Sequence, residues 1–166
     1  MASQHATQVV LASRPTTARA SLENFRVETV PMPVPEAGQV LLRVDTLSLD
    51  PYMRGRMSDA KSYAKPAEVG QPMPGESVAT VLESHSADLQ PGDVVLAQAG
   101  WRSHAALPAA GLKKLALDGI QASAYLGVLG MPGFTAWSGL EAIGKPKESG
   151  RNASSGRGTR MHQRLS

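Results

Sequence analysis

The distribution of proline and glycine constrains the fold of this chain more than any other feature. Twelve prolines and sixteen glycines are spread over 166 residues, and the stretch PMPVPEAGQ at residues 31–39 holds three of these prolines and one glycine. A helix cannot cross such a stretch, because proline lacks a backbone N–H and its ring clashes with the preceding turn. Residues 50–75 are punctuated in the same way and are expected to form a loop. Short elements joined by turns are therefore expected.

Apolar runs between these turns predict strands, and the longest, Gln39–Leu49, is rich in Leu and Val. The apolar spacing becomes helical only after residue 121, where Gly130-Met131-Pro132-Gly133 is expected to separate two short helices. This pattern predicts a mainly β fold, a small barrel or sandwich with short C-terminal helices. The expected strands are Thr7–Ala12, Phe25–Val30, Gln39–Leu49, Glu76–Ser84, the run after the turn in 90–98, Trp101–Leu107 and Leu112–Leu117, and the expected helices are Ala122–Leu129 and Thr135–Ile143.

The composition argues against several classes of protein. Apolar residues make up 42% and charged residues 19% of the chain, as in an ordinary globular domain. No apolar run reaches the length of a membrane span, and the N-terminus lacks the pattern of a secretory signal. The chain has no cysteine, and none of its four histidines is paired at ligand spacing, so no metal site is expected. A cytoplasmic location is the expected one.

The net charge of +3 has a local origin. Residues 151–166 hold Arg151, Arg157, Arg160 and Arg164 and no acidic residue, so the rest of the chain is nearly neutral. No basic face interleaved with aromatic residues precedes them, and a nucleic-acid partner is not expected. Nucleic-acid binding stays an alternative that rests on these arginines alone. It requires salt-dependent binding that disappears when residues 149–166 are removed.

Two segments have a composition that suits a binding site. Leu47–Met57 (LSLDPYMRGRM) places a carboxylate, a phenol and a guanidinium just after a strand, where binding pockets are commonly furnished. Gly130–Gly139 (GMPGFTAWSG) begins with a glycine-rich turn that lets backbone approach a ligand. Each segment also has a purely structural explanation, a solvated turn for the first and a corner between helices for the second. Pattern alone favours the structural explanation in both cases.

Several longer strings, taken in order, resemble one family. They are VLASRP, ENFRVE, GQVLLRV, LSLDPYMRGRMSD, GDVVLA, GW and LGVLGMPGFTAWSGLEAIGKPKE. Their order and spacing are similar to those of the zinc-independent medium-chain dehydrogenase/reductases. The branch that they resemble is that of the NADPH-dependent curcumin reductases, prostaglandin reductases and plant alkenal double-bond reductases. The likeness covers residues 8–148.

The resemblance implies a GroES-like, partly open β-barrel, which is the substrate-side half of a two-domain enzyme. Such enzymes transfer hydride from NADPH to the β-carbon of an α,β-unsaturated ketone or aldehyde. Zinc relatives polarise the carbonyl with a metal held partly by cysteine, a residue that this chain lacks. Carried over by position, Tyr52, Gln98 and Trp101 would line the substrate pocket, and Met131 and Thr135 would lie against the nicotinamide.

Two departures from the family pattern limit which residue roles can be carried over to this chain. Trp137 stands where many relatives have tyrosine, which puts contacts through a phenol there in doubt. The tyrosine credited with assisting proton transfer belongs to a part of the family that has no counterpart here, so no catalytic acid is named.

The resemblance ends near residue 148, which divides the chain into a GroES-like domain at 1–148 and a tail at 149–166. In the family, KPKE leads into the first strand and the glycine-rich loop of a Rossmann domain, whereas this chain continues SGRNASSGRGTR. Codons for Ser149 to Gly158 can be chosen that, read one base later, encode Ala-Gly-Glu-Thr-Leu-Val-Val-Ala-Ala, the expected strand. A shifted reading frame and a disordered polar tail both stay open.

The absence of a Rossmann segment has two expected consequences. The chain is expected to bind NADPH weakly and to be nearly inactive, because nothing holds the cofactor phosphates. Apolar residues of the last helix, such as Leu140 and Ile143, are expected to be exposed and to favour a homodimer or other association. A non-catalytic GroES-like module for binding or dimerisation is therefore the alternative function. The coding DNA downstream would distinguish the two.

Overall fold

The computed structural model describes residues 4–60 and 64–145. The chain divides into two compact units, one ending at Leu126 and the other beginning at Gly127. The first unit holds the strands and is the body of the domain, and the second is helical. The expected boundary between residues 148 and 149, and the tail that follows it, lie outside the described residues.

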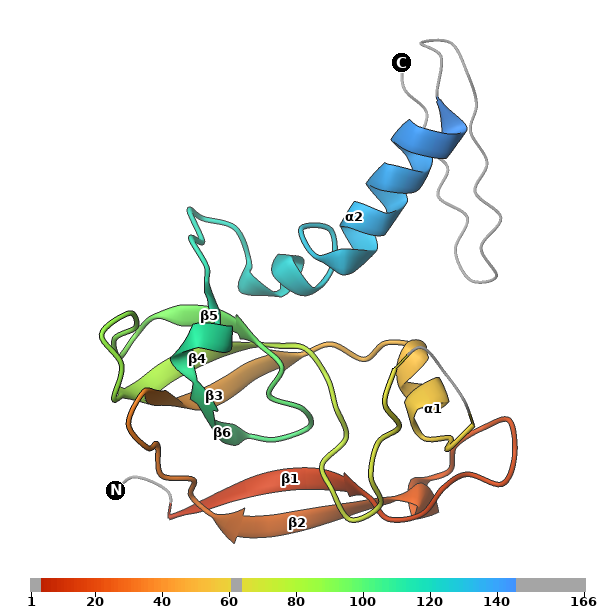
Figure 1. Ribbon diagram of the computed structural model, residues 1–166, viewed down its shortest axis with the longest axis horizontal. Helices are drawn as coiled ribbons and strands as arrows, with labels where there is room; N and C mark the ends of the chain where they lie inside the picture. The colour runs from red at the N-terminus through yellow and green to blue at the C-terminus, as the bar shows by residue number, and fades with distance from the viewer. Residues whose placement is uncertain (1–3, 61–63, 146–166) are drawn as a thin grey trace. The chain divides into compact units, whose positions relative to one another are not determined.

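A two-stranded sheet begins the first unit (Figure 1). Strand β1 (His5–Leu11) pairs antiparallel with β2 (Phe25–Pro31), with His5 opposite Pro31 and Leu11 opposite Phe25. The connection ends in a short 3-10 helix, η1 (Leu22–Asn24). The buried Asn24 fixes this turn, because its Oδ1 accepts from the Ser21 N–H at 2.8 Å and its Nδ2 donates to the Ser13 hydroxyl at 3.1 Å. The strand predicted at Phe25–Val30 is confirmed as β2.

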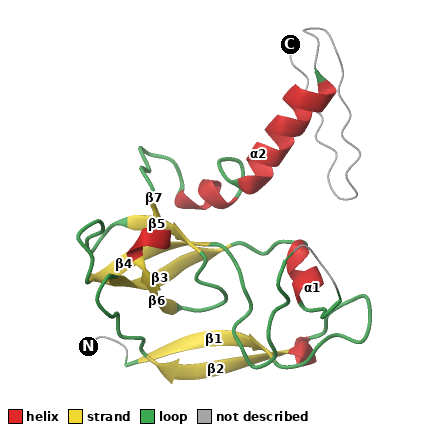
Figure 2. Ribbon diagram, viewed as in Figure 1, coloured by secondary structure: helices red, strands yellow, loops and turns green. Residues whose placement is uncertain are grey.

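A five-stranded antiparallel sheet forms the second layer, and Figure 2 shows its strands in yellow. Its order is β6 (His104–Pro108), β3 (Gln39–Leu47), β4 (Ser77–Ser84), β5 (Val94–Ala97) and β7 (Lys113–Lys114). One face of the central pair is fully buried, through Val40 and Leu42 on β3 and Ala79 and Val81 on β4. The two sheets do not join into one closed barrel, which confirms the prediction of a mainly β, partly open architecture.

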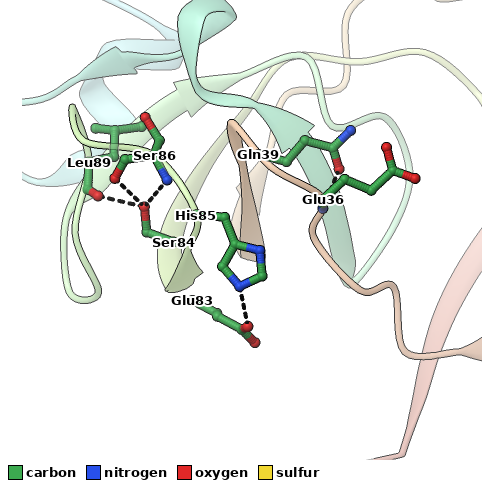
Figure 3. A network of polar contacts seen from close by, with 7 residues as sticks. All are labelled: Glu36, Gln39, Glu83, Ser84, His85, Ser86 and Leu89. Carbon is green, nitrogen blue, oxygen red and sulfur yellow. Dashed lines mark hydrogen bonds and ion pairs between the residues drawn. The ribbon is translucent and has the colours of Figure 1, made fainter.

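Polar contacts fix the turn that follows β4 (Figure 3). The Ser84 hydroxyl donates to the Leu89 carbonyl at 2.6 Å and accepts from the Ser86 N–H at 3.2 Å. The next residue, His85, donates its backbone N–H to Gln39, and its Nε2 lies 2.9 Å from Oε1 of Glu83. These contacts tie the 84–90 turn to the start of β3, which closes that end of the five-stranded sheet.

The segment 50–75 departs from the expected loop. It contains a short helix, α1 (Tyr52–Arg56), which begins directly after Pro51. Proline suits the first turn of a helix, because its fixed φ is already helical and the missing N–H has no partner there. The prediction treated this proline only as a breaker and was wrong for these five residues.

Three elements near the end of the first unit are shorter or displaced relative to the prediction. Strand β6 begins at His104 rather than Trp101, and the strand expected at Leu112–Leu117 is reduced to Lys113–Lys114. The helix expected over Ala122–Leu129 is a 3-10 helix, η3 (Ala122–Leu126). The glycine at position 127 follows it, a residue that disfavours continuation of a helix.

The second unit is a helix that begins four residues earlier than expected. Helix α2 spans Met131–Ser138 and continues as a π-helix, η4 (Gly139–Gly144). The Gly-Met-Pro-Gly stretch was predicted to separate two helices, but Pro132 lies in the first turn of α2. Gly133 is needed there, because a side chain would overlap the carbonyl of Val128. Within the described ranges, no helix is long and apolar enough to cross a membrane.

Candidate functional site

An apolar pocket of about 370 Å³ lies beside α1 in the first unit. Its walls come from the loop before β2, the start of β2, the β3–α1 connection with α1 itself, and the loop residues Met73 and Trp101. The lining residues are Ala20, Phe25, Leu49, Asp50, Pro51, Met53, Arg54, Met57, Met73 and Trp101. The volume falls within the range of small-molecule sites, and the predominance of methionine and aromatic side chains suits an apolar ligand.

The aromatic wall of the pocket is a stacked pair. The rings of Phe25 and Trp101 lie 5.4 Å apart between centroids, with 15° between their planes. The Trp101 backbone is held on both sides, because its N–H donates to Met73 at 2.8 Å and its carbonyl accepts from Val9 at 2.9 Å. The indole Nε1 is buried and has no hydrogen-bond partner within residues 4–60 and 64–145. Trp101 therefore forms part of the pocket wall and also holds a buried donor that has no partner among the described residues.

Glycine at two positions allows the backbone to pass close to this wall. A Cβ on Gly75 would lie 3.0 Å from Leu47, 3.1 Å from Met53 and 3.3 Å from Trp101. Gly100 has a φ of +69°, and a Cβ there would lie 2.7 Å from the carbonyl oxygen of Met73. These glycines permit the chain segments at 73–75 and 99–101 to pack directly against each other.

Arg54 on α1 holds the loop at residues 17–20, which supplies one of the lining residues. Its Nη2 donates to the Thr17 carbonyl at 2.5 Å, and its Nε donates to the Ala18 carbonyl at 3.1 Å. Both bonds use the charge of the guanidinium to fix main chain, which is a strong kind of hydrogen bond. Arg54 therefore positions the loop that carries Ala20, a lining residue.

A second arginine fixes α1 from its C-terminal end. Arg14 donates from Nη1 to the Met57 carbonyl at 2.9 Å and from Nη2 to the Ala67 carbonyl at 3.1 Å. Helices leave their last carbonyls without partners, and a cation there is favourable. At the other end of the helix, the Ser48 hydroxyl donates to the Asp50 carboxylate at 2.7 Å. Both ends of this short helix are thus anchored.

The three residues predicted to bind substrate lie in three different environments in the structure. Trp101 lines the pocket, and Tyr52 lies on α1, half-buried against the methionine cluster beneath it. Gln98 is exposed and donates from Nε2 to Glu76 at 3.3 Å. The pocket therefore unites Trp101 with the helix that carries Tyr52, and Gln98 does not line it. The roles assigned to the three residues stay predictions.

The two residues predicted to contact the cofactor belong to the second unit. Met131 and Thr135 are both exposed on α2 and lie four residues apart, so they share one face of the helix. An exposed thioether and hydroxyl on one face suit contact with a nicotinamide ring and its carboxamide. Their assignment to the cofactor stays a prediction.

Sequence reasoning located part of the lining, because the candidate segment Leu47–Met57 supplies six of the ten lining residues. Phe25 was assigned to a strand with no functional role, and Met53, Met57 and Met73 were not singled out. Phe25 meets Trp101 through contacts between segments far apart in the sequence, which no local pattern records. Arg54 was noted only as part of the polar segment after β3.

A metal centre was not expected, and the described residues contain no group of three or more His, Asp or Glu side chains that could hold a metal ion.

Comparison with known proteins gives this pocket a context. Residues 7–115 match the family described as the N-terminal domain of oxidoreductase. The NADPH-dependent curcumin reductase of Escherichia coli is 52% identical over 139 residues, which cover 84% of this chain and 40% of that protein. The 2-alkenal reductase (NADP(+)-dependent) of Nicotiana tabacum is 38% identical over 123 residues, covering 72% of this chain and 36% of the tobacco protein.

A solved structure supports the same relationship. The crystal structure of CurA in complex with NADPH from Vibrio vulnificus matches with a TM-score of 0.79 at 47% identity, over 86% of this chain and 42% of that chain. This agreement confirms the GroES-like fold. The chain spans about two-fifths of the length of these relatives. It belongs to the family of oxidoreductase N-terminal domains, in the group that contains the curcumin, prostaglandin and alkenal reductases.

Proposed function

We propose that this chain is the substrate-side domain of an NADPH-dependent oxidoreductase that reduces the C=C bond of α,β-unsaturated ketones and aldehydes. The observation that carries the proposal is the apolar pocket, whose lining includes Trp101, a residue with a buried indole N–H that has no partner among the described residues. An enone has an apolar body and one carbonyl oxygen, so it needs an apolar pocket and at least one donor. Membership of the oxidoreductase family supports the same assignment.

The chemistry of the pocket follows from the position of that donor. When hydride adds to the β-carbon of an enone, negative charge develops on the carbonyl oxygen. A fixed donor in a dry pocket stabilises such charge more than water does, because no reorganisation is needed during the reaction. In this proposal the Nε1–H of Trp101, which is buried in the structure, becomes accessible when substrate enters the pocket and donates to the carbonyl oxygen. The described residues offer no assigned catalytic acid.

NADPH, when bound, supplies the hydride. Met131 and Thr135 are proposed to contact the nicotinamide end of the cofactor, and Tyr52 and Gln98 to contact substrate outside the pocket lined by Trp101. The proposed reaction does not use zinc, as the family resemblance implies. The 166-residue polypeptide, assayed by itself, is expected to bind NADPH weakly and to turn over little, since the proposed contacts reach only the nicotinamide.

Binding of an enone to the pocket is testable in the chain as it exists. The ¹⁵N-labelled 166-residue chain is titrated with 4-phenyl-3-buten-2-one, and the two indole N–H signals are followed, with Trp137→Phe used for assignment. We expect a saturable downfield shift of the Trp101 signal, because a new hydrogen bond deshields the proton. Butylbenzene, which lacks the carbonyl, is the matched control and should perturb the pocket without the downfield shift. No saturable change in the pocket residues at millimolar enone would contradict the proposal.

An alternative function, a non-catalytic module that binds or dimerises, is favoured by one observation. Helix α2 and its continuation expose several apolar side chains, including Phe134 at 67%, Trp137 at 61% and Ile143 at 84%. Exposed apolar surface of this kind often marks an interaction site. Light scattering of the purified chain, beside the variant Trp137→Ser/Ile143→Ser, tests it. Concentration-dependent dimers that the double variant loses support this alternative, and a monomer at all concentrations rejects it.

A further inference from the structure

A second pocket, of about 160 Å³, lies in the first unit on the other side of β1, between the two sheets. Its walls are Gln8, Val30, Pro31, Pro33, Arg102, His104, Ala105 and Ala106. Arg102 faces Gln8 through an isolated antiparallel bridge, so the loop before β6 is held against β1. The substrate pocket proposed above shares no residue with this one.

The guanidinium of Arg102 is the unusual group in this pocket. Arg102 is partly buried, its Nε has no hydrogen-bond partner, and burial lowers the pKa of the side chain below its ordinary value. None of the described residues forms an ion pair with it. Partial withdrawal of a guanidinium from water without a counter-charge is unfavourable, and a bound anion would offset that cost.

The neighbouring charges are already matched among themselves. Arg43 is 2.8 Å from Asp45, and Arg26 is 2.6 Å from Glu28, whose second oxygen accepts from Gln8 at 2.9 Å. The unmatched charge in the pocket is therefore that of Arg102.

His104 offers a second donor to the pocket. The Ser103 hydroxyl accepts from the Thr7 N–H at 2.9 Å and lies 3.0 Å from Nδ1 of His104, so it can donate its own hydrogen to that nitrogen. This arrangement favours the neutral tautomer that carries its proton on Nε2. Burial, together with the charge of Arg43, lowers the pKa of His104, which keeps the ring neutral at pH 7. A neutral imidazole presents an N–H without adding charge.

We propose that this pocket binds a small organic carboxylate, held by the guanidinium of Arg102 with the Nε2–H of His104 as second donor. A guanidinium fork matches the two oxygens of a carboxylate. Apart from Gln8, the remaining walls are valine, alanine and proline side chains, which suit a short alkyl chain better than a fully hydrated phosphate. Water occupies about 30 Å³ per molecule in the liquid, so the pocket holds an anion of the size of butyrate.

The test is a titration of the ¹⁵N-labelled 166-residue chain with sodium butyrate at constant ionic strength, against sodium chloride and sodium phosphate. We expect saturable shifts at residues 8, 30 and 102–106 with butyrate, and a rise in Tm. Chloride should give no saturable shifts. Arg102→Gln should weaken binding at least tenfold and abolish the rise in Tm. Arg19→Gln, which removes an exposed guanidinium that lies outside the pocket lining, should leave affinity within twofold.

Several outcomes overturn the proposal. Shifts of equal size with chloride indicate general screening, and tighter binding of phosphate than of butyrate indicates an inorganic anion site. Unchanged butyrate affinity in Arg102→Gln would show that the guanidinium of Arg102 does not bind the carboxylate. If Arg102→Gln fails to give a dispersed spectrum, Arg102→Lys decides the matter. It retains the charge without the fork and should bind butyrate several-fold more weakly than the unaltered chain, and equal affinity rejects bidentate recognition.

Discussion

The indole of Trp101 stacks on the ring of Phe25 at a centroid distance of 5.4 Å, and its buried Nε1–H has no hydrogen-bond partner in the described part of the chain. The first property stabilises the domain, since stacked aromatic pairs contribute about 0.5–1.5 kcal/mol beyond their buried area. The second opposes stability, since a buried donor left unsatisfied costs about 1–3 kcal/mol. The Nε1–H of Trp101 is present despite this destabilisation, which makes it a candidate for a role in binding.

Substitution of Trp101 separates these two properties. Trp101→Phe retains a stacked ring and removes the unsatisfied donor, so the free energy of unfolding in urea should stay within about 1 kcal/mol of the original or rise. Affinity for 4-phenyl-3-buten-2-one should nevertheless fall by about fivefold, the value of one modest hydrogen bond. Trp101→Ala removes the stack as well and should lower stability by about 3 kcal/mol.

The matched control for that pair is Phe134→Ala, which removes a ring that is 67% exposed on α2. Its free energy of unfolding should change by less than about 0.5 kcal/mol. Equal enone affinity in Trp101→Phe and in the unaltered chain would remove the indole N–H from the proposed mechanism.

Two glycine substitutions should act in opposite directions. Gly100 has a φ of +69°, and an added Cβ would lie 2.7 Å from the Met73 carbonyl oxygen, so Gly100→Ala should destabilise the chain by about 2 kcal/mol or more. Gly55 lies within α1 with nothing near its Cβ position. Gly55→Ala should therefore stabilise by about 0.5–1 kcal/mol, because alanine favours helix. Both values come from urea unfolding curves, and the account of the backbone contact at 73–101 is wrong if the two variants respond alike.

Arg54 is predicted to act as a positioning residue for the loop at residues 17–20. Arg54→Met removes the bonds to the Thr17 and Ala18 carbonyls, so amide hydrogen exchange in residues 16–21 should become faster by about tenfold while the sheets stay protected. Enone affinity should fall several-fold because one wall is loosened. Arg19→Met, at an exposed residue within the same loop, is the control and should change neither quantity. Unchanged exchange in Arg54→Met would show that the loop is ordered by other contacts.

The acid stability of the domain should depend on Asp93. Its carboxylate is 9% exposed, lies 2.7 Å from Nζ of Lys114 and accepts from the Gln90 N–H at 3.0 Å. The bond to Lys114, and then the bond from Gln90, hold the pKa of Asp93 below its ordinary value. The contribution of this group to stability is therefore present above the pKa of the unfolded chain and is lost as the pH falls through the lower folded value.

Urea unfolding at pH 7 and at pH 3 measures that contribution. Asp93→Asn should be less stable than the unaltered chain at pH 7, and its stability should fall less on acidification. Asp88→Asn, at an acidic residue in the preceding turn, should retain the original pH dependence. Parallel curves for Asp93→Asn and the unaltered chain would mean that the ion pair to β7 contributes nothing.

The sequence predicted local structure better than it predicted the pocket. Alternation and turn residues are local signals, and they located β1, β2, β3 and β4 to within a few residues. Helix α1 was missed because a proline can interrupt a helix or stand at its start, and Pro51 lies at the N-cap of α1. The early start of α2 has the same cause at Pro132.

The composition of the site depends on contacts that no local pattern contains. Phe25 and Trp101 stand 76 positions apart in the sequence, and the loop that Arg54 holds is 36 and 37 residues away from it. Trp101 and Tyr52 were predicted through a resemblance, which transfers such contacts from a known fold. Phe25 and Met73 were given no role in that argument, and only the structure places them in the same pocket as Trp101.

The central claim is that this chain is the substrate-side domain of an NADPH-dependent C=C reductase, and one measurement tests it most directly. Residues 1–145 replace the matching N-terminal portion of the Escherichia coli curcumin reductase, and the purified chimera receives an enone with NADPH deuterated at C4. The account predicts NADPH oxidation and a product that carries deuterium at the β-carbon, both reduced in a chimera with Trp101→Phe. A folded chimera that binds NADPH but transfers no deuterium to the enone would contradict it.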